Sequence, residues 1–170
     1  IGIFSMSQKP VNLLEFEPLV KDKLPKMVYG YYVSGSDDQI TLRDNRNAFS
    51  RIRLRPRYMR GVEERDLTTT VLGNTWKTPI GVAPMGFMGM AHPDGEPAVA
   101  RACANNEVVM TLSTMSNYTI EDVGEATDFR KWFQLYVYRD RAVTEALVKR
   151  AEEQGFEALV LTVDVPVLGR

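Results

Sequence analysis

Polar side chains stand at the ends of apolar stretches in the second half of the chain. Pro84 and Met85 end "PIGVAPM", Ser113 ends "VVMTLS", Gln134 lies inside "KWFQLYVYRD", and Thr162 lies near the end of "EALVLTVD". Hydroxyl and amide groups, without a cluster of metal ligands, suit hydrogen bonding to a planar heteroaromatic ring with carbonyl and N–H edges. The sequence therefore predicts a small-ligand site with no metal.

Gln134 is the most informative of these residues, because burial of an unpaired amide inside a strand is costly. Successive strand residues face opposite sides, so each face can be read separately. One face carries Trp132, Gln134 and Tyr136, and the other carries Phe133, Leu135 and Val137. The second face is a plain core, and the first indicates that a ligand with hydrogen-bonding edges lies against it.

The elements that would position these side chains alternate between strand and helix patterns. Strands are expected at 79–85, 108–113, 131–140 and 157–164, with helices at 94–105, 120–126 and 141–155. This order is typical of a parallel α/β sheet, either an open doubly wound sheet or a (β/α)8 barrel. In both, ligands bind at the carboxyl ends of the strands. No G-x-G-x-x-G follows the first strand, which counts against a dinucleotide-binding Rossmann fold.

The first part of the chain has a different character. Helices are predicted within 12–24, 25–35 and 36–52, and a hairpin is predicted at 68–79 with its turn at Gly73–Asn74. Pro25 and Gly35 are expected to open and close the second helix, and Ser36 or Asp37 to cap the third. We therefore predict a helical segment with a hairpin over residues 1–75, followed by the α/β part over 76–170.

Composition limits the class of protein. The 170 residues are 44% hydrophobic and 25% charged, enough for one ordinary domain with a core. A formal net charge of -1 gives no general attraction to nucleic acid, so a small molecule is the expected partner. No apolar run approaches the ~18 residues of a membrane helix, and the N-terminal sequence lacks the features of a signal peptide. A cytoplasmic protein without a membrane segment is the expectation.

Three further residues carry a structural interpretation. The single cysteine, Cys103, excludes an internal disulfide and fits a reducing compartment, and its helical context predicts a small buried hydrophobe. His92, in "MAHPDGE", is predicted to be a loop or cap histidine and not a catalyst. Asp94 and Glu96 are predicted to start the helix that follows.

Four longer segments resemble one family. "KLPKMVYGYYVSGSDDQITLRDNRNAFSRIRLRPR", "MAHPDGE", "WFQLYVYRDR" and "LTVDVPVLGR" together resemble the N-terminal half of the FMN-dependent (S)-2-hydroxy acid oxidases and dehydrogenases. The resemblance covers nearly all of residues 20–170 in order and spacing. It implies a (β/α)8 TIM barrel with FMN at its C-terminal mouth. The chain would supply the N-terminal helical segment and about the first four strands.

The resemblance also implies cofactor contacts at the strand ends. The main chain of the segment after the first strand would approach the flavin, and three side chains would hydrogen-bond its ring. These residues are Ala83, Pro84 and Met85 for the main chain, and Ser113, Gln134 and Thr162 for the side chains.

The substrate contacts are implied in the same way. Tyr31 aligns with the tyrosine that holds the substrate carboxylate, and Tyr136 with the active-site tyrosine beside the substrate hydroxyl. Met115 takes the place of a pocket tryptophan of glycolate oxidase, and Gly86 the place of its alanine. Both differences favour a medium or large 2-hydroxy acid over glycolate.

The function implied is oxidation of an (S)-2-hydroxy acid to the 2-oxo acid, with a hydride equivalent passed to flavin N5 and then to oxygen. The family's general-base histidine lies in the second half of its barrel, outside these 170 residues. Arg170, which aligns with the first of two tandem arginines, is not assigned to the site. Two alternatives stay open: a dehydrogenase that passes electrons to a quinone or cytochrome, and a non-catalytic half-barrel. The resemblance implies a homo-oligomer. The expected location stays cytoplasmic, with the peroxisome as the alternative for a eukaryotic source.

Overall fold

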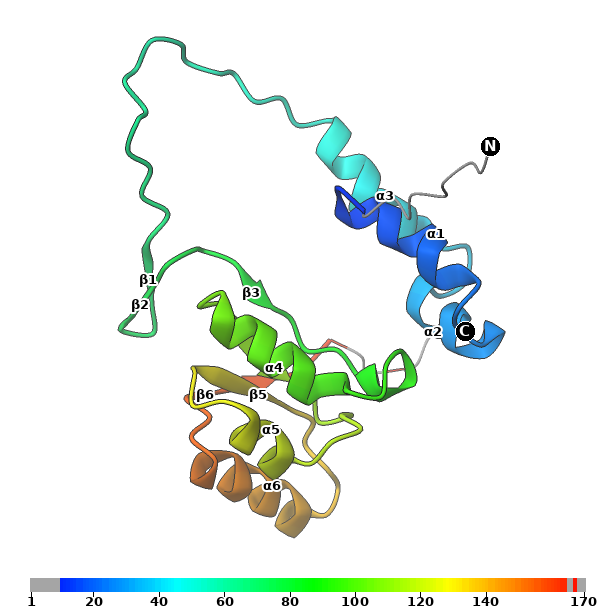
Figure 1. Ribbon diagram of the computed structural model, residues 1–170. Coiled ribbons are helices and arrows are strands. Elements are labelled where there is room, and N and C mark those ends of the chain that lie inside the picture. The colour runs from blue at the N-terminus through cyan, green and yellow to red at the C-terminus, as the bar shows by residue number, and fades with distance from the viewer. Residues whose placement is uncertain (1–9, 165–166, 168–170) are drawn as a thin grey trace, which may run out of the picture. The chain divides into compact units, whose positions relative to one another are not determined.

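A computed structural model describes residues 10–164 and 167 of the chain (Figure 1). The chain divides into two compact units after Leu54. The hairpin that the sequence grouped with the helical segment belongs instead to the second unit. The Trp76 ring lies 5.2 Å from the Trp132 ring, and Arg130 Nη1 donates to the Thr75 carbonyl at 3.2 Å. These contacts attach the hairpin to the α/β part.

The first unit is helical. A 3-10 turn at Leu13–Glu15 leads into α1 (Phe16–Lys21), followed by α2 (Lys26–Val33) and α3 (Ile40–Ser50). Pro25 is the N-cap of α2, as expected, and the helix ends at Val33, with Ser34 as its C-cap and Gly35 beyond it. The predicted caps of α3 were wrong. The N-cap is Gln39, with a left-handed φ of 56°, because a turn closed by the Gln39 N–H and the Ser36 carbonyl precedes the helix.

The hairpin pairs β1 (Thr69–Val71) with antiparallel β2 (Asn74–Trp76). Its turn is made by Leu72 and Gly73, one residue earlier than predicted, and Asn74 begins the second strand. Both turn residues have positive φ, 49° and 78°. A two-residue turn of this kind matches the twist of the flanking strands.

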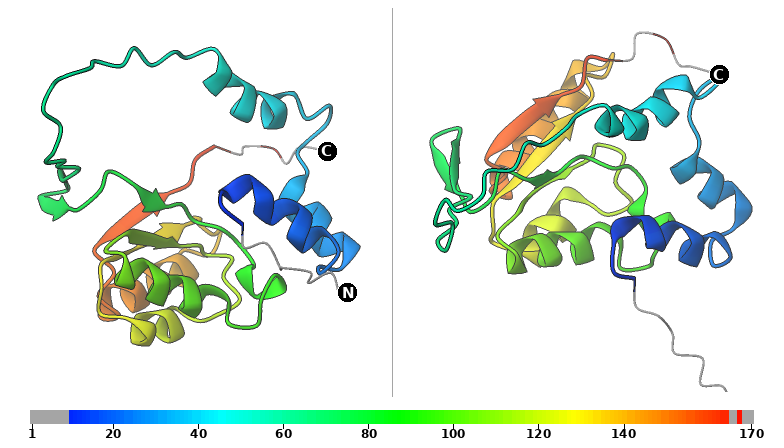
Figure 2. Two further views of the ribbon diagram at one scale, coloured as in Figure 1. Left: turned by 45° about the horizontal axis from the view of Figure 1, so that its top comes forward. Right: turned by 90° about the horizontal axis from the view of Figure 1, so that it is seen from above.

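The second unit also contains the predicted parallel sheet. Its strands are β3 (Gly81–Val82), β4 (Val109–Leu112), β5 (Lys131–Leu135) and β6 (Ala158–Leu161), paired in chain order. Helices α4 (Gly95–Asn105), α5 (Ile120–Ala126) and α6 (Arg141–Glu153) make the connections (Figures 1 and 2). All four strands are shorter than predicted, and Tyr136 follows β5 instead of lying within it.

The core lies between one face of this sheet and the three helices, as Figure 2 shows. Phe133 and Leu135 point into it, as strand alternation predicts, and Phe133 is only 1% exposed. Cys103 of α4 is part of the same core, which confirms its predicted role. Burial raises the pKa of its thiol. Within the described residues, no helix is long and apolar enough to cross a bilayer.

Candidate functional site

Three of the predicted ligand residues form a hydrogen-bonded row at the carboxyl ends of adjacent strands. The Ser113 hydroxyl donates to Gln134 Oε1 at 3.2 Å, and Gln134 Nε2 donates to Thr162 Oγ1 at 2.8 Å. Ser113 directly follows β4, Gln134 lies near the end of β5, and Thr162 directly follows β6. Parallel pairing in register brings these ends to one edge. We call Ser113, Gln134 and Thr162 the strand-end row.

The amide of Gln134 is buried and largely partnered. The side chain is 2% exposed, and its Oε1 also accepts from the Thr114 backbone N–H at 3.0 Å. Two bonds fill the acceptor capacity of that oxygen, whereas the second Nε2 hydrogen and the Thr162 hydroxyl hydrogen remain for a ligand. The row thus offers donors to an acceptor-bearing edge such as a ring carbonyl.

The loop after β4 connects the row to two candidate substrate residues. Met115 N–H donates to the Ser113 hydroxyl oxygen at 3.1 Å. The Thr114 hydroxyl donates to the Gln134 carbonyl at 2.5 Å and accepts from the Tyr136 N–H at 3.3 Å. The side chains of Met115 and Tyr136 are 41% and 42% exposed. Both are therefore accessible beside the row.

The segment after β3 lies next to this loop. Ala83, Pro84 and Met85 are exposed. A few residues later, the Phe87 N–H donates to the Met115 carbonyl at 3.0 Å. The structure therefore brings the predicted cofactor residues of all four strands to the same edge of the sheet.

Tyr31 lies elsewhere in the chain, on α2 of the first unit. Its ring is 52% exposed and makes an edge contact with Tyr32 at a centroid distance of 5.2 Å. Its predicted contact with a substrate carboxylate stays a prediction.

Glu96 joins the loops beside the candidate site, which the sequence analysis missed. It was assigned only to the start of a helix, yet it is fully buried and accepts two backbone N–H groups, from Met88 and Asn117, each at 3.1 Å. A signal was present, because the helical spacing places Glu96 on the same face as the buried residues Ala100 and Cys103.

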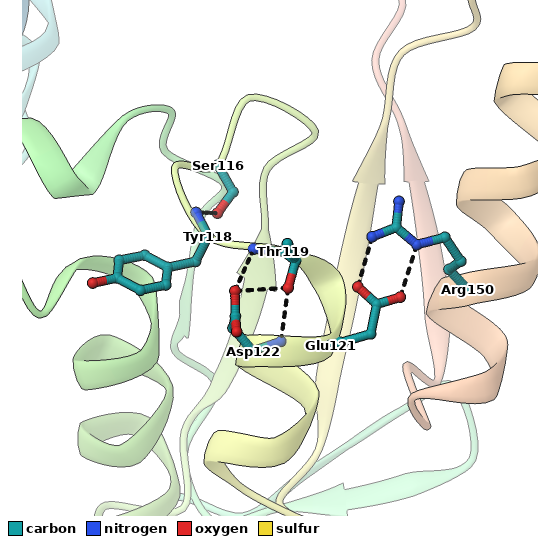
Figure 3. A network of polar contacts seen from close by, with 6 residues as sticks. All are labelled: Ser116, Tyr118, Thr119, Glu121, Asp122 and Arg150. Atoms are coloured by element: carbon teal, nitrogen blue, oxygen red, sulfur yellow. Dashed lines mark hydrogen bonds and ion pairs between the residues drawn. The ribbon is translucent and has the colours of Figure 1, made fainter.

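Local polar contacts fix the remainder of the β4 loop and the start of α5 (Figure 3). Thr119 and Asp122 form a capping box at the first turn of the helix. Glu121 receives two hydrogen bonds from Arg150 of α6, at 2.7 and 2.6 Å. These bonds are the main cause that lowers the pKa of Glu121 to about 2.

His92 lies in an exposed loop, where its Nδ1 accepts from the Asp94 N–H at 3.2 Å. This agrees with its predicted role as a loop or cap residue. In residues 10–164 and 167, no three His, Cys, Asp or Glu side chains are grouped so as to hold a metal ion.

Curated relatives of the chain share its sequence at about half of the aligned positions. Over 159 residues it is 54% identical to glycolate oxidase 3 of Arabidopsis thaliana and 52% identical to the glycolate oxidase of Spinacia oleracea. The alignments cover 94% of this chain and 43% of each relative. The chain therefore spans less than half the length of these relatives.

Solved structures give the same result for the fold. A flavocytochrome b2 mutant with pyruvate bound matches with a TM-score of 0.91 and 38% identity, over 95% of this chain and 42% of that one. A mandelate oxidase matches with a TM-score of 0.89 and 36% identity, over 95% of this chain and 47% of that one. The predicted fold is confirmed: the four parallel strands and their helices form part of a (β/α)8 barrel.

A family model describes nearly the whole chain. The FMN-dependent dehydrogenase model matches residues 20–170, which agrees with the resemblance found in the sequence, and it implies FMN as the cofactor. The chain belongs to the FMN-dependent dehydrogenase family.

Proposed function

We propose that the protein uses FMN to oxidise an (S)-2-hydroxy acid to the 2-oxo acid, with oxygen as the final electron acceptor. The strand-end row is the observation that carries this proposal. It supplies the donors predicted for a flavin ring, at the ligand edge of a sheet, in a chain about half identical to glycolate oxidases.

The residues of the row fit the cofactor. The free Nε2 hydrogen of Gln134 and the Thr162 hydroxyl would donate to carbonyl or nitrogen acceptors at the edge of the ring. The exposed residues Ala83–Met85 would border the same ring with their main chain. When bound, FMN supplies an acceptor for the hydride equivalent that leaves the substrate carbon.

Two tyrosines would orient the substrate. The Tyr136 hydroxyl would hydrogen-bond the substrate hydroxyl, because this residue directly follows β5, beside the row. The Tyr31 hydroxyl would donate to the substrate carboxylate, and a bond to a charged group contributes about 1.5–3 kcal/mol. We assign the base that removes the hydroxyl proton to a histidine in the part of the family barrel that this chain does not span.

Oxygen is favoured as the acceptor because the relatives at 50% identity or more are named oxidases. We further propose a homo-oligomer, as in the family that the sequence resembles. We also propose a cytoplasmic location, or a peroxisomal one in a eukaryotic cell. Light scattering on the purified protein and imaging of a tagged copy test these two points.

The central experiment uses protein expressed from its complete coding sequence. The purified protein should be yellow and release FMN on denaturation. It should reduce a dye with a 2-hydroxy acid, and in air it should form hydrogen peroxide. Colourless protein that takes up no FMN on incubation would contradict the assignment. Dye reduction without peroxide formation would indicate that a quinone or cytochrome, and not oxygen, is the electron acceptor.

A further inference from the structure

We propose that Glu96 is a positioning residue, which holds the two loops of the flavin site at the separation that the cofactor requires. The loops are the β3 loop, residues 83–91, and the β4 loop, residues 113–119. The inference deepens the proposed function and rests on it, because these loops carry the main-chain segment and the hydroxyl predicted to contact FMN.

A single oxygen of Glu96 joins the two loops. Oε1 accepts from the Met88 N–H of the β3 loop and from the Asn117 N–H of the β4 loop, each at 3.1 Å. The residue lies in the first turn of α4 and is 0% exposed. The partial positive charge of a helix N-terminus stabilises a carboxylate there. Because Glu96 is fully buried, its two hydrogen bonds, which we call the Glu96 clamp, are shielded from competing water.

The same two loops make two further direct contacts. The Phe87 N–H donates to the Met115 carbonyl, and the Gly89 N–H donates to Asn117 Oδ1, both at 3.0 Å. The approach at Gly89 is so close that an added Cβ would lie 2.9 Å from Asn117 Oδ1. Even one methyl group would force the Asn117 side chain, or the loop that carries it, to shift.

The second oxygen of Glu96 shows that this carboxyl does more than fill space. Oε2 is buried and has no hydrogen-bond partner among the described residues. Such an atom is costly in a protein interior, and an apolar side chain would avoid that cost. What the carboxyl adds is the double acceptor Oε1. Displacement of the β4 loop would reach the strand-end row through the Met115–Ser113 hydrogen bond.

The test compares Glu96→Ala, which removes the acceptor, with Glu96→Gln, which keeps it. Both are made in the protein expressed from its complete coding sequence. In FMN-free protein, Glu96→Ala should speed hydrogen exchange of the Met88 and Asn117 amides by about tenfold or more, because a lost hydrogen bond of this kind is worth that factor. It should raise the Kd for FMN by about tenfold, and Glu96→Gln should stay within about threefold of wild type.

Two further variants separate positioning from general stability. Val123→Ala truncates a fully buried core residue of α5 outside both loops and leaves its backbone bond to Thr119 in place, so it should lower thermal stability but leave FMN affinity nearly unchanged. Gly89→Ala places a methyl group against the Asn117 side chain and disturbs the contact between the loops with Glu96 intact. It should weaken FMN binding, and it keeps the proposal testable if Glu96→Ala does not fold.

Several results would overturn the proposal. These are unchanged amide exchange and FMN affinity in Glu96→Ala, an equal loss of FMN in Glu96→Gln, or an equal loss in Val123→Ala at the same stability. Normal FMN binding by Gly89→Ala would also overturn it. Wild-type protein that binds no FMN would contradict the proposed function instead. Amide exchange in flavin-free protein would then still test whether Glu96 holds the two loops together.

Discussion

The hydroxyl of Thr162 is the part of the strand-end row that can be removed with the least change of shape. Thr162→Val should raise the Kd for FMN by about 5–10-fold, the value of one neutral hydrogen bond. Gln134→Leu should weaken binding by about 1–3 kcal/mol, because it also leaves the Ser113 hydroxyl and the Thr114 N–H without an acceptor. Fluorescence titration of flavin-free protein measures both.

Thr111→Val is the matched control for these variants. Thr111 is 6% exposed, and its pairing with Trp132 places it on the same sheet face as the row, but it lies two residues before Ser113. Loss of the Thr111 hydroxyl should change FMN affinity less than twofold if the strand ends alone contact the flavin. Equal weakening by Thr111→Val and Thr162→Val would show that the row has no special role.

Met115 should set the preference among substrates. We expect lactate, mandelate or a longer acid to be oxidised better than glycolate, and Met115→Trp to shift kcat/KM toward glycolate by about tenfold. The physical reason is that a flexible thioether leaves a less defined pocket than a rigid indole. A panel of acids assayed with a dye acceptor measures the ratio.

Met59→Trp is the control, because that side chain is fully exposed outside the candidate site. It should leave the acid preference unchanged. If wild-type protein oxidises glycolate clearly best, the interpretation of Met115 and Gly86 is wrong.

Single residues could be predicted from the sequence where a local rule applied. The polar ends of β4, β5 and β6 were found because amide or hydroxyl groups recur at the ends of consecutive strands, and because an unpaired buried amide is costly. Their mutual bonds could not be predicted, because the partners of Gln134 come from two other strands. Helical spacing could have indicated that Glu96 is buried, but its two partners could not be predicted, because they lie on two loops outside its own helix.

At the scale of elements, the contact between α5 and α6 should depend on pH. The pKa of Glu121 is lowered to about 2 in the folded chain, against 4.5 ordinarily, mainly by the Arg150 hydrogen bonds. A lowered folded pKa gives stability that is present above about pH 5 and is lost as the pH falls toward 2. Arg150→Gln should therefore lower the melting temperature at pH 7 and have progressively less effect between pH 5 and pH 3.

The size of this effect should be modest. The two side chains are 42% and 37% exposed, so the pair is worth about 0.5–1 kcal/mol even with two parallel bonds. Lys149→Gln removes a charge from the neighbouring exposed position of α6 and should show no such pH dependence. A difference between wild type and Arg150→Gln that stays constant from pH 7 to pH 3 would contradict the assignment.

The order and type of the elements in the α/β part were predictable from periodicity, but their ends were not. The hairpin turn fell at Leu72–Gly73 because both positions adopt positive φ, which a leucine does not signal. β3 and β5 end early because the chain leaves the sheet to form the loops of the candidate site. The N-cap of α3 was missed because a left-handed glutamine is stabilised by the turn before it.

For the whole molecule, FMN should act as a stabilising ligand. FMN at about 100 times its Kd should add about 2.7 kcal/mol to the free energy of unfolding, which raises the melting temperature by about 5–10 °C. Thermal unfolding with and without FMN measures this shift. At the same FMN concentration, the free energy of unfolding of Gln134→Leu should rise by less than that of wild type. The difference should equal the binding free energy that the variant has lost.

Riboflavin is the natural comparison ligand, because it carries the ring without the phosphate. A smaller but measurable shift with riboflavin would agree with ring contacts at the strand-end row. An equal shift for wild type and Gln134→Leu with either ligand would place the flavin elsewhere.

One face of the parallel sheet packs into the core and the other carries the candidate flavin site, and β5 has residues on both faces. Phe133 and Leu135 pack against the helices, whereas Trp132 and Gln134 lie on the opposite face. A library of random variants could be sorted once by cellular abundance and once by flavin fluorescence. Substitutions at odd-numbered and even-numbered positions of β5 should then be depleted in different sorts. Odd positions of this strand should be depleted in the abundance sort. Substitutions at Gln134 should instead leave a protein that accumulates but binds less flavin.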